Sequence, residues 1–341
     1  MVDLVQRSCG ICKLSLPRVS IASVFRMPAT VSPFFNAGEN RLRAGWRILV
    51  LLLTTLMVGL ASAYPARLGW WPSSFTWVVY LSMASAALLA VVAGIDRRPL
   101  QALGFKFGRG GWRDLTLGFL VSLSAMGFMF ALSWLCGWVQ VDGRPQAGAG
   151  IAFCASLAGQ LAFYSFSVSY EEALCRGYLL RNLCEGFQGR HLGPKAASVI
   201  ALVVSSLLFG LMHVRNLNAT TLSFLVLVLL GGLMGWVYLV RGSLAMPIGL
   251  HLGWNFAMGN IFGLPVSGVA TGTSVFIVRE HGPALWTGDG FGPEAGMSGL
   301  LALLMVVVIL SFGLHGTAGR SQILFGNINS RRGSQLQKGG E

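Results

Sequence analysis

The run IAFCASLAGQLAFYSFSVSYEEALCRG, residues 151–177, joins a long apolar stretch to a cluster of charge. Its apolar part is long enough to cross the hydrocarbon core of a bilayer, which takes about 20 residues. Glu171, Glu172 and Arg176 then follow while apolar residues keep recurring at helical spacing. Charge inside a membrane span is costly and marks a functional candidate by default. We therefore expect one helix that extends to about residue 187 and holds buried charge.

The whole composition is that of a membrane protein. Of the 341 residues, 54% are hydrophobic and 11% are charged, whereas soluble domains carry about 25% charged residues. No alternating β-barrel pattern is visible, so membrane-spanning segments must be helical to pair their backbone groups. The sequence predicts an all-α, polytopic membrane helix bundle with about eight transmembrane helices. The apolar runs are residues 47–64, 76–94, 115–139, 151–172, 196–213, 220–240, 243–262 and 299–315.

This pattern divides the chain into three parts. Residues 46–316 form the predicted transmembrane bundle, and its polar residues concentrate at about 151–262. Residues 1–45 are expected to be a disordered, basic, cytosolic extension, and residues 317–341 a disordered cytosolic tail. The Gly- and Pro-rich segment 263–298 fits either a solvated linker or a gate or binding surface, because long loops inside compact proteins are often functional.

The amino-terminal extension leaves two questions open. Translation starts either at Met1 or at Met27, because the residues between them have no structural pattern and no signal peptide is evident. Cys9 and Cys12 form a lone Cys-x-x-Cys without a second pair, which is a weak signal for zinc or redox use.

The net charge of +13 is distributed as in a membrane protein. With eight spans, 21 of the 25 lysines and arginines fall on the side that holds both termini. Such a bias places both termini in the cytoplasm, and nucleic acid is not needed to explain the charge. Short loops and the absence of an organellar signal favour a bacterial inner (plasma) membrane. The opposite side holds Arg67, Arg144, Arg215 and Arg279.

The polar residues of the fourth, fifth and seventh spans are predicted to meet at one depth. Glycines and a proline between residues 189 and 194 mark a turn, and Glu171 and His213 lie 20 and 22 residues from its middle. Antiparallel helices bring both to about 30 Å from the turn. His251 lies about 12 Å along the next polar helix. An acid and two imidazoles can therefore converge.

The two neighbouring acids are expected to have different partners. Adjacent helical residues differ in direction by about 100°, whereas residues four apart share a face. Glu172 and Arg176 should therefore form an ion pair that braces the helix, which leaves Glu171 without a local partner. A carboxylate in apolar surroundings is suited to act as a general base. The alternative is that both acids are ordinary helix-end charges among lipid headgroups.

Two further pairs repeat the spacing of four. Phe209 can pack beside His213 and fix its ring, and His251 shares a helical stripe with Asn255. Imidazole and carboxamide groups suit either metal binding or stabilisation of an oxyanion. A single histidine in a span is more often an interhelical hydrogen-bonding residue. Two histidines beside an acid pair favour a hydrolytic site.

Two mechanisms fit these residues. In the first, Glu171, His213 and His251 hold zinc or another divalent metal, with a water in the fourth position. In the second, Glu171 and His213 activate the water directly, while His251 and Asn255 bind the oxyanion. The soluble zinc-protease signature His-Glu-x-x-His is absent. The sequence leaves both mechanisms open.

Together the motifs resemble those of the CAAX-processing and bacteriocin-processing (abortive-infection-like) intramembrane proteases. The resemblance implies an eight-helix bundle with a membrane-embedded peptidase core at about 151–262. It also implies that Glu171 and His213 activate water, and that His251 and Asn255 stabilise the oxyanion. Members of this family are often labelled metalloproteases, although a metal-free, glutamate-driven mechanism is also proposed. The matching motifs are Glu171-Glu172-x-x-x-Arg176, Phe209-x-x-x-His213 and His251-x-x-x-Asn255.

The expected function is hydrolysis of a peptide or protein substrate at the membrane, with the lipid bilayer as the other partner. Prenylated CAAX tails are expected only in a cell that prenylates proteins; a bacterium would use the activity in peptide maturation, self-immunity or protein processing. One alternative is a proton- or cation-coupled transporter, which would predict inverted repeats and broken helices in corresponding halves. The other is a catalytically silent membrane scaffold.

Overall fold

The computed structural model describes residues 33–36, 40–72, 75–143, 150–188 and 192–314. Contacts divide the chain into two units, residues 1–43 and 44–341. In the first unit, strands β1 (Phe35–Asn36) and β2 (Arg41–Leu42) form a small antiparallel pair within the predicted extension. The other expectations for the two ends of the chain lie outside the described residues. They are the disorder of the rest of residues 1–45 and of the tail 317–341, the start at Met1 or Met27, and the pair Cys9–Cys12.

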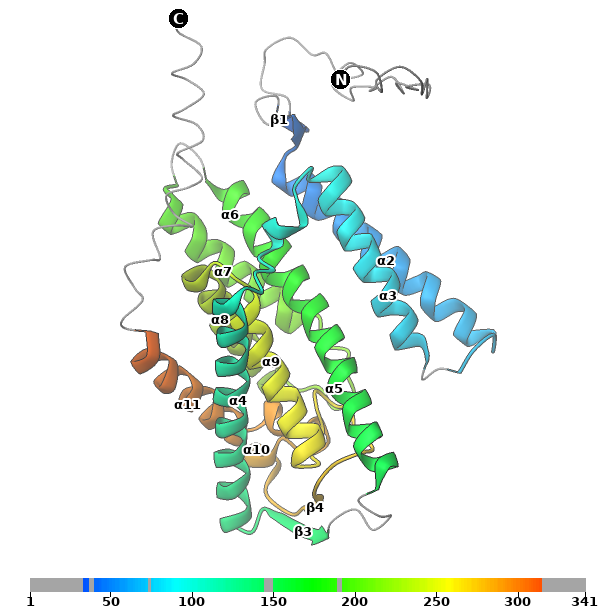
Figure 1. Ribbon diagram of the computed structural model, residues 1–341, viewed down its shortest axis with the longest axis vertical. Helices are drawn as coiled ribbons and strands as arrows, with labels where there is room; N and C mark the ends of the chain where they lie inside the picture. Colours follow the sequence, from blue (N-terminus) through cyan, green and yellow to red (C-terminus); the bar gives the residue numbers. More distant parts are fainter. Residues whose placement is uncertain (1–32, 37–39, 73–74, 144–149, 189–191, 315–341) are drawn as a thin grey trace, which may run out of the picture. The chain divides into compact units, whose positions relative to one another are not determined.

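The second unit is a helical bundle, as predicted (Figure 1). Its only described strands, β3 (Val139–Gly143) and β4 (Ile277–Glu280), pair antiparallel with Val139 opposite Glu280. Short π-helical or 3₁₀ turns continue several of the α-helices. The α-helices are α2 (Ala44–Arg67), α3 (Thr76–Ala90), α4 (Arg109–Leu135), α5 (Ile151–Glu172), α6 (Arg181–Phe187), α7 (Pro194–Leu211), α8 (Thr221–Arg241), α9 (Ala245–Phe256), α10 (Ala284–Thr287) and α11 (Met297–Leu314).

The fourth predicted helix continues to residue 187, as expected. Helix α5, the π-helical turn η4 (Ala173–Leu180) and α6 follow one another without a break from Ile151 to Phe187. The next helix, α7, starts at Pro194, so the predicted turn falls in the right interval, although its middle residue lies outside the described part. A proline at the first position of a helix is favoured because its missing N–H would have no partner there.

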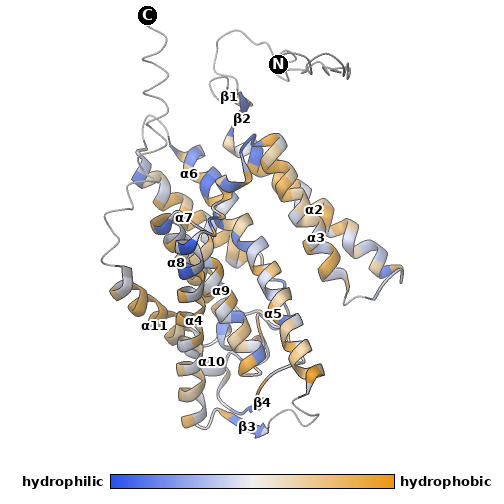
Figure 2. Cartoon of the chain, viewed as in Figure 1, coloured by the Kyte–Doolittle hydropathy of each residue, from blue (hydrophilic) through white to orange (hydrophobic). Residues whose placement is uncertain are grey.

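Six of the described helices are long and apolar enough to cross a membrane. Figure 2 shows hydrophobic residues along the length of helices such as α2 and α3. Large apolar side chains stay exposed on these helices, for example Leu56 and Leu135, as lipid-facing positions require. The chain is therefore an integral, multi-pass membrane protein. The spans are residues 44–67, 76–95, 109–135, 151–187, 194–211 and 221–241.

The other two predicted spans are also helical, but they are not among these six. Residues 243–262 contain α9 and the π-helical turn η5 (Ala257–Ile261), and residues 299–315 contain most of α11. Eleven of the twelve residues of α9 are buried inside the bundle. A helix that is apolar all round is typical of a buried position as well as of a membrane span. Hydropathy alone could not distinguish the two.

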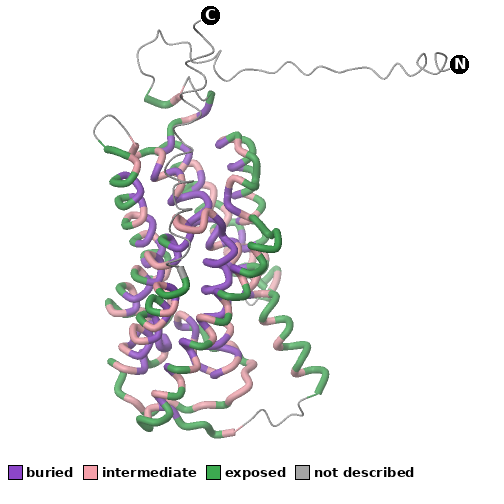
Figure 3. The backbone as a smooth tube through the Cα atoms, turned by 60° about the vertical axis from the view of Figure 1, so that its left-hand side comes forward, coloured by how far each residue is buried: buried purple, intermediate pink, exposed green. Residues whose placement is uncertain are grey.

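Helix α9 is in close backbone contact with α4. A Cβ atom at Gly249 would lie 2.1 Å from the carbonyl oxygen of Leu115, and one at Gly253 would lie 2.4 Å from that of Phe119. Small residues at a spacing of four allow such close approach between membrane helices. In Figure 3 the buried residues gather on the inner helices of the bundle. The contact fixes α9, which carries His251, at the centre.

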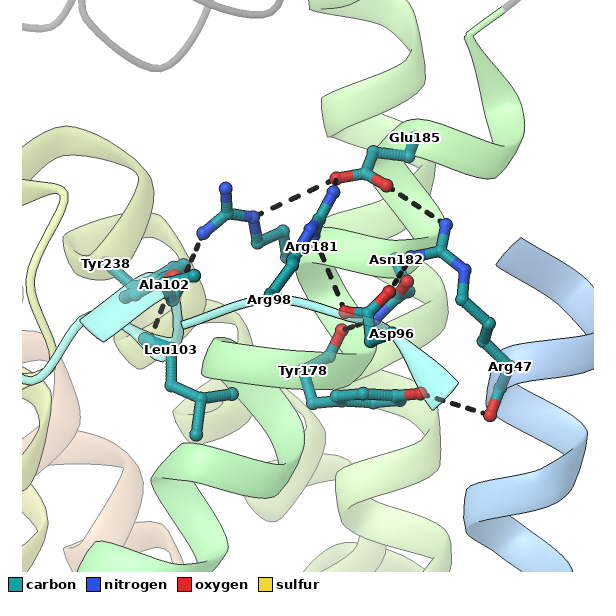
Figure 4. Close-up of polar contacts among 10 residues, drawn as sticks. All are labelled: Arg47, Asp96, Arg98, Ala102, Leu103, Tyr178, Arg181, Asn182, Glu185 and Tyr238. Atoms are coloured by element: carbon teal, nitrogen blue, oxygen red, sulfur yellow. Dashed lines mark hydrogen bonds and ion pairs between the residues drawn. The ribbon is translucent and has the colours of Figure 1, made fainter. Parts of the chain in front are cut away.

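An ionic network fastens the hairpin of α2 and α3 to α6 (Figure 4). Arg47, which is only 2% exposed, pairs with Asp96 and, at 3.1 Å, with Glu185 on α6. Glu185 also pairs with Arg98. The Tyr178 hydroxyl donates to the carbonyl of Arg47 at 3.1 Å. Buried charges require such partners, because an unpaired one carries a desolvation penalty of several kcal/mol.

Residues 263–298, which we call the cap segment, pack onto the bundle. They comprise β4, α10 and the short 3₁₀ turns η6 (Asp289–Phe291) and η7 (Pro293–Ala295). Phe291 and Glu294 are buried, so the solvated-linker alternative is wrong for this part of the segment. One carboxylate oxygen of Glu280 is buried without a hydrogen-bond partner among the described residues. Burial, together with the charge of Asp289, raises the pKa of Glu280 to about 7.

The contact between α4 and α9 predicts that Gly253→Ala destabilises the protein. The added methyl group must displace backbone, and overpacking typically costs about 1–3 kcal/mol. Gly159→Ala on α5 is the matched control, since a Cβ there meets nothing within 4 Å. Both changes bring the same gain in helix propensity, so the difference in their thermal unfolding in detergent measures packing alone. Equal melting temperatures would contradict the predicted contact.

The environment of Glu280 predicts a pH-dependent stability. Its folded pKa of about 7 exceeds the ordinary value of 4.5, so the folded state binds the proton more tightly than the unfolded state. Stability from this group is therefore present at low pH and is lost as the pH rises from about 4.5 to about 7. Glu280→Gln removes this loss. The melting temperature of the variant relative to wild type should increase between pH 5 and pH 8; a constant difference would contradict the burial of Glu280.

Candidate active site

The carboxylate of Glu172, at the end of α5, is fully buried at the centre of the candidate site. Its Oε1 accepts hydrogen bonds from Nη1 of Arg176 at 2.8 Å and from Nδ1 of His251 at 2.9 Å. Its Oε2 is buried without a hydrogen-bond partner in the described part of the chain. The predicted ion pair between Glu172 and Arg176 is therefore present. It is also shared with a histidine from another helix, and the helix-end alternative for Glu172 is wrong.

Arg176 connects this carboxylate to two more helices. It lies in the π-helical turn η4, and such turns are frequent at functional sites because they redirect side chains. Its Nη2 donates to the carbonyl of Gly231 on α8 at 3.1 Å. Its guanidinium carbon lies 4.4 Å from the ring centre of Phe209 on α7, a cation–π distance. The guanidinium therefore joins the end of α5 to α7 and α8.

Glu171 has a different environment from its neighbour. Its side chain is 24% exposed, whereas that of Glu172 is 0% exposed. Its Oε2 lies 4.0 Å from Nε2 of His251. The two acids therefore flank His251 from its two ring nitrogens. As predicted, Glu171 has no ion-pair partner on its own helix among the described residues.

His213 lies just beyond the end of α7 and is held by Phe209. Its Nδ1 lies 2.9 Å from the carbonyl oxygen of Phe209, and the ring centres are 5.0 Å apart. A carbonyl only accepts, so Nδ1 is the donor in this hydrogen bond, and Nε2 has a lone pair whenever the ring carries one proton. The ring of Phe209 also lies edge-on to His251 at 6.0 Å. This lone pair is what a proton-accepting role for His213 would require.

His251 and Asn255 lie one turn apart on α9, as the spacing predicted. Both are buried, at 7% and 8% exposure. Asn255 therefore carries a carboxamide on the same buried stripe of α9 as the His251 imidazole.

Of the predicted residues, four are linked by direct polar contacts, namely Glu171, Glu172, Arg176 and His251. His213 joins them through Phe209. No group of three His, Cys, Asp or Glu side chains in the described ranges is arranged to hold a metal ion. A zinc ion needs such ligands at about 2 Å from a common point. Glu171, His213 and His251 therefore do not form that set.

Two contributors at the site were not assigned a role from the sequence. Gly231 supplies the carbonyl for Arg176, and its only signal was a Gly-Gly pair within an apolar run. Ser205 donates to the carbonyl of Cys175 at 3.1 Å, inside the π-helical turn. Serine in an apolar helix gives no sign of which backbone group it will reach. Both contacts join distant parts of the chain.

Comparison with known proteins agrees with this geometry. Residues 147–257, about one third of the chain, match the family model described as type II CAAX prenyl endopeptidase Rce1-like. The match includes all three motifs. Neither the curated proteins nor the solved structures contain a match to the chain. The resemblance to the CAAX-processing and bacteriocin-processing proteases is confirmed for residues 147–257, which are similar to the Rce1-like family model.

Proposed function

We propose that this chain is an intramembrane endopeptidase that hydrolyses a peptide bond with a water activated by Glu171 and His213. The family match supports an intramembrane endopeptidase in general. The observation that carries the mechanism is His251 lying between two carboxylates, with Nδ1 bonded to Glu172 and Nε2 facing Glu171. This arrangement places two carboxylates at one imidazole, while Phe209 packs between the rings of His213 and His251.

The reaction begins when Glu171 takes a proton from a water that Nε2 of His213 also orients. The water oxygen then bonds to the carbonyl carbon of the substrate, and the electron pair of the C=O bond moves to oxygen. The protonated ring of His251 and the carboxamide of Asn255 donate hydrogen bonds to this oxyanion. When the tetrahedral intermediate collapses, the C–N bond breaks and the proton held by Glu171 passes to the leaving amine.

Glu172 and Arg176 support this step without reacting. Glu172 holds Nδ1 of His251, which orients the ring and stabilises its protonated form, as an acid does for the histidine of a serine protease. Arg176 balances the charge of Glu172, because two carboxylates and one imidazolium would otherwise leave buried negative charge.

The substrate is proposed to be a peptide or protein at the membrane, reached from the lipid bilayer. In a bacterium this would be a maturing peptide, an immunity partner or a processed protein, and a prenylated tail only where prenylation occurs. The proposed location is the bacterial inner membrane with both termini in the cytoplasm, from the bias of basic residues. No observation favours the transporter or the silent scaffold.

The divalent-metal alternative has its own test. Elemental analysis of the purified protein, together with His213→Ala, separates it from the metal-free step. Stoichiometric zinc that is lost in His213→Ala would contradict the water activation proposed here. Metal content below stoichiometry with full cleavage activity would support it.

Glu171→Gln should lower the rate of peptide cleavage at least 100-fold, because general bases typically contribute about 10²–10⁴-fold. Cleavage of a membrane-anchored reporter in proteoliposomes measures the rate, and thermal unfolding checks that the variant is folded. Glu280→Gln makes the same chemical change in the cap segment and should retain cleavage. Retained cleavage in Glu171→Gln would remove Glu171 from the mechanism.

Arg176→Ala should destabilise the protein by about 3–5 kcal/mol, because it removes one partner of a buried ion pair and leaves the negative charge of Glu172 only partly compensated. The double variant Arg176→Ala with Glu172→Gln should recover part of that loss, since the uncompensated charge is gone. Unfolding in detergent measures both. An unchanged stability in Arg176→Ala with lost cleavage would instead indicate a direct role for Arg176 in the reaction.

A further inference from the structure

The cap segment bonds to the loop that carries His213. The side chain of Asn216 donates from Nδ2 to the carbonyl of Ser267 at 3.0 Å. The backbone N–H of Asn216 donates to the carbonyl of His213, also at 3.0 Å. Ser267 is therefore connected through one residue to the backbone of His213.

Ser267 is also linked to α9, through the buried carboxylate of Glu294. Both the backbone N–H and the hydroxyl of Ser267 donate to Oε2 of Glu294, at 2.9 Å and 2.6 Å. The other oxygen, Oε1, accepts from the indole nitrogen of Trp254 at 3.1 Å. Trp254 is 1% exposed and directly precedes Asn255. The four residues Asn216, Ser267, Glu294 and Trp254, which we call the relay, thus link the two sides of the candidate site.

Two features of the relay are energetically unfavourable on their own, a left-handed backbone conformation and a buried carboxylate. Ser267 has a φ of +47°, a left-handed conformation that is unfavourable for a residue other than glycine. Glu294 is a carboxylate only 2% exposed, and hydrogen bonds satisfy both of its oxygens. Strained backbone persists where the surrounding structure enforces it, and such sites cluster at functional positions.

The neighbouring residue makes the docking of this turn tight. Gly268 has a φ of +87°, and a Cβ there would lie 2.2 Å from the carbonyl oxygen of Leu217. Leu217 follows Asn216 on the His213 loop. The turn that carries Ser267 therefore packs against this loop with no room for a side chain at Gly268.

We propose that Ser267 and Glu294 are positioning residues that set the distance between the His213 loop and the His251–Asn255 face of α9. This inference rests on the proposed function and deepens it, because the family match ends at residue 257 and does not include the cap segment. A reaction that activates water on one side and binds the oxyanion on the other depends on that distance. Misplacement by about 1 Å can cost a factor of 10² in rate.

The first test compares two serines. Ser267→Ala removes the hydrogen bond from the hydroxyl to Glu294. It keeps the two backbone hydrogen bonds of residue 267, from its N–H to Glu294 and from Asn216 to its carbonyl. We expect kcat to fall about 10-fold or more with KM within a factor of about two, because positioning acts on the reaction step and not on substrate binding. Ser298→Ala is the matched control: its buried hydroxyl donates within the cap segment, to the carbonyl of Trp286 at 2.6 Å. It should alter stability but not kcat.

Glu294→Gln extends the comparison, since it keeps the size of the side chain but leaves only one accepting oxygen. It should lower kcat as Ser267→Ala does. If Ser267→Ala and Glu294→Gln change kcat no more than Ser298→Ala at equal melting temperature, the relay only stabilises the cap segment and the inference is overturned.

A double-mutant cycle tests the relay independently of cleavage. Asn216→Ala and Trp254→Phe each remove one terminal bond of the relay, and neither residue bonds to the other. The relay predicts that their effects on the unfolding equilibrium constant and on kcat are non-additive by more than about twofold, the limit for independent sites. Additive unfolding energies would overturn the relay. If the two changes are coupled in unfolding but the wild-type protein cleaves no substrate, the relay stands and only the proposed function is contradicted.

Discussion

A carboxylate that is completely buried is stable only beside compensating positive charge or hydrogen-bond donors. Glu172 is such a carboxylate, and the arrangement of the helices around it depends on its partners. It is 0% exposed, and its partners Arg176 and His251 come from its own helix and from α9. Arg176 in turn bonds to Gly231 on α8 and covers the ring of Phe209 on α7. One buried charge thereby fixes the approach of four helical segments. Two neighbouring residues with the same side chain thus have different surroundings, because Glu171 keeps 24% of its side chain exposed.

The glycines of α9 explain how a histidine reaches that carboxylate. Gly249 and Gly253 let α9 approach the backbone of α4, so that the whole circumference of the helix is buried. The cap segment then closes around the other end of the site through Ser267 and Glu294. Close packing on one side and hydrogen bonds on the other leave α9 little freedom. A rigid α9 is what a preorganised oxyanion site requires.

Local spacing allowed much of this to be predicted from the sequence. The extension of the fourth helix, the pair Glu172–Arg176 and the contact of Phe209 with His213 depend on residues four apart or on helical periodicity. All eight predicted apolar runs are helical, and α9 and α11 are the two that are not among the six long membrane helices. The ring nitrogen of His251 that meets Glu172, and the links between the cap segment and both sides of the site, are contacts between distant residues. The spacing of residues along the sequence does not predict such long-range contacts. The catalytic roles and the metal remain predictions.

The coupling between Glu172 and His251 tests the central claim most directly. Glu172→Gln, His251→Ala and the double variant form a cycle whose unfolding free energies are measured in detergent at pH 7. A direct hydrogen bond to a buried carboxylate predicts that the two changes are non-additive by about 1–3 kcal/mol, with the double variant less damaged than the sum. Additivity within about 0.5 kcal/mol would show that the two side chains do not meet, and would contradict the site described here.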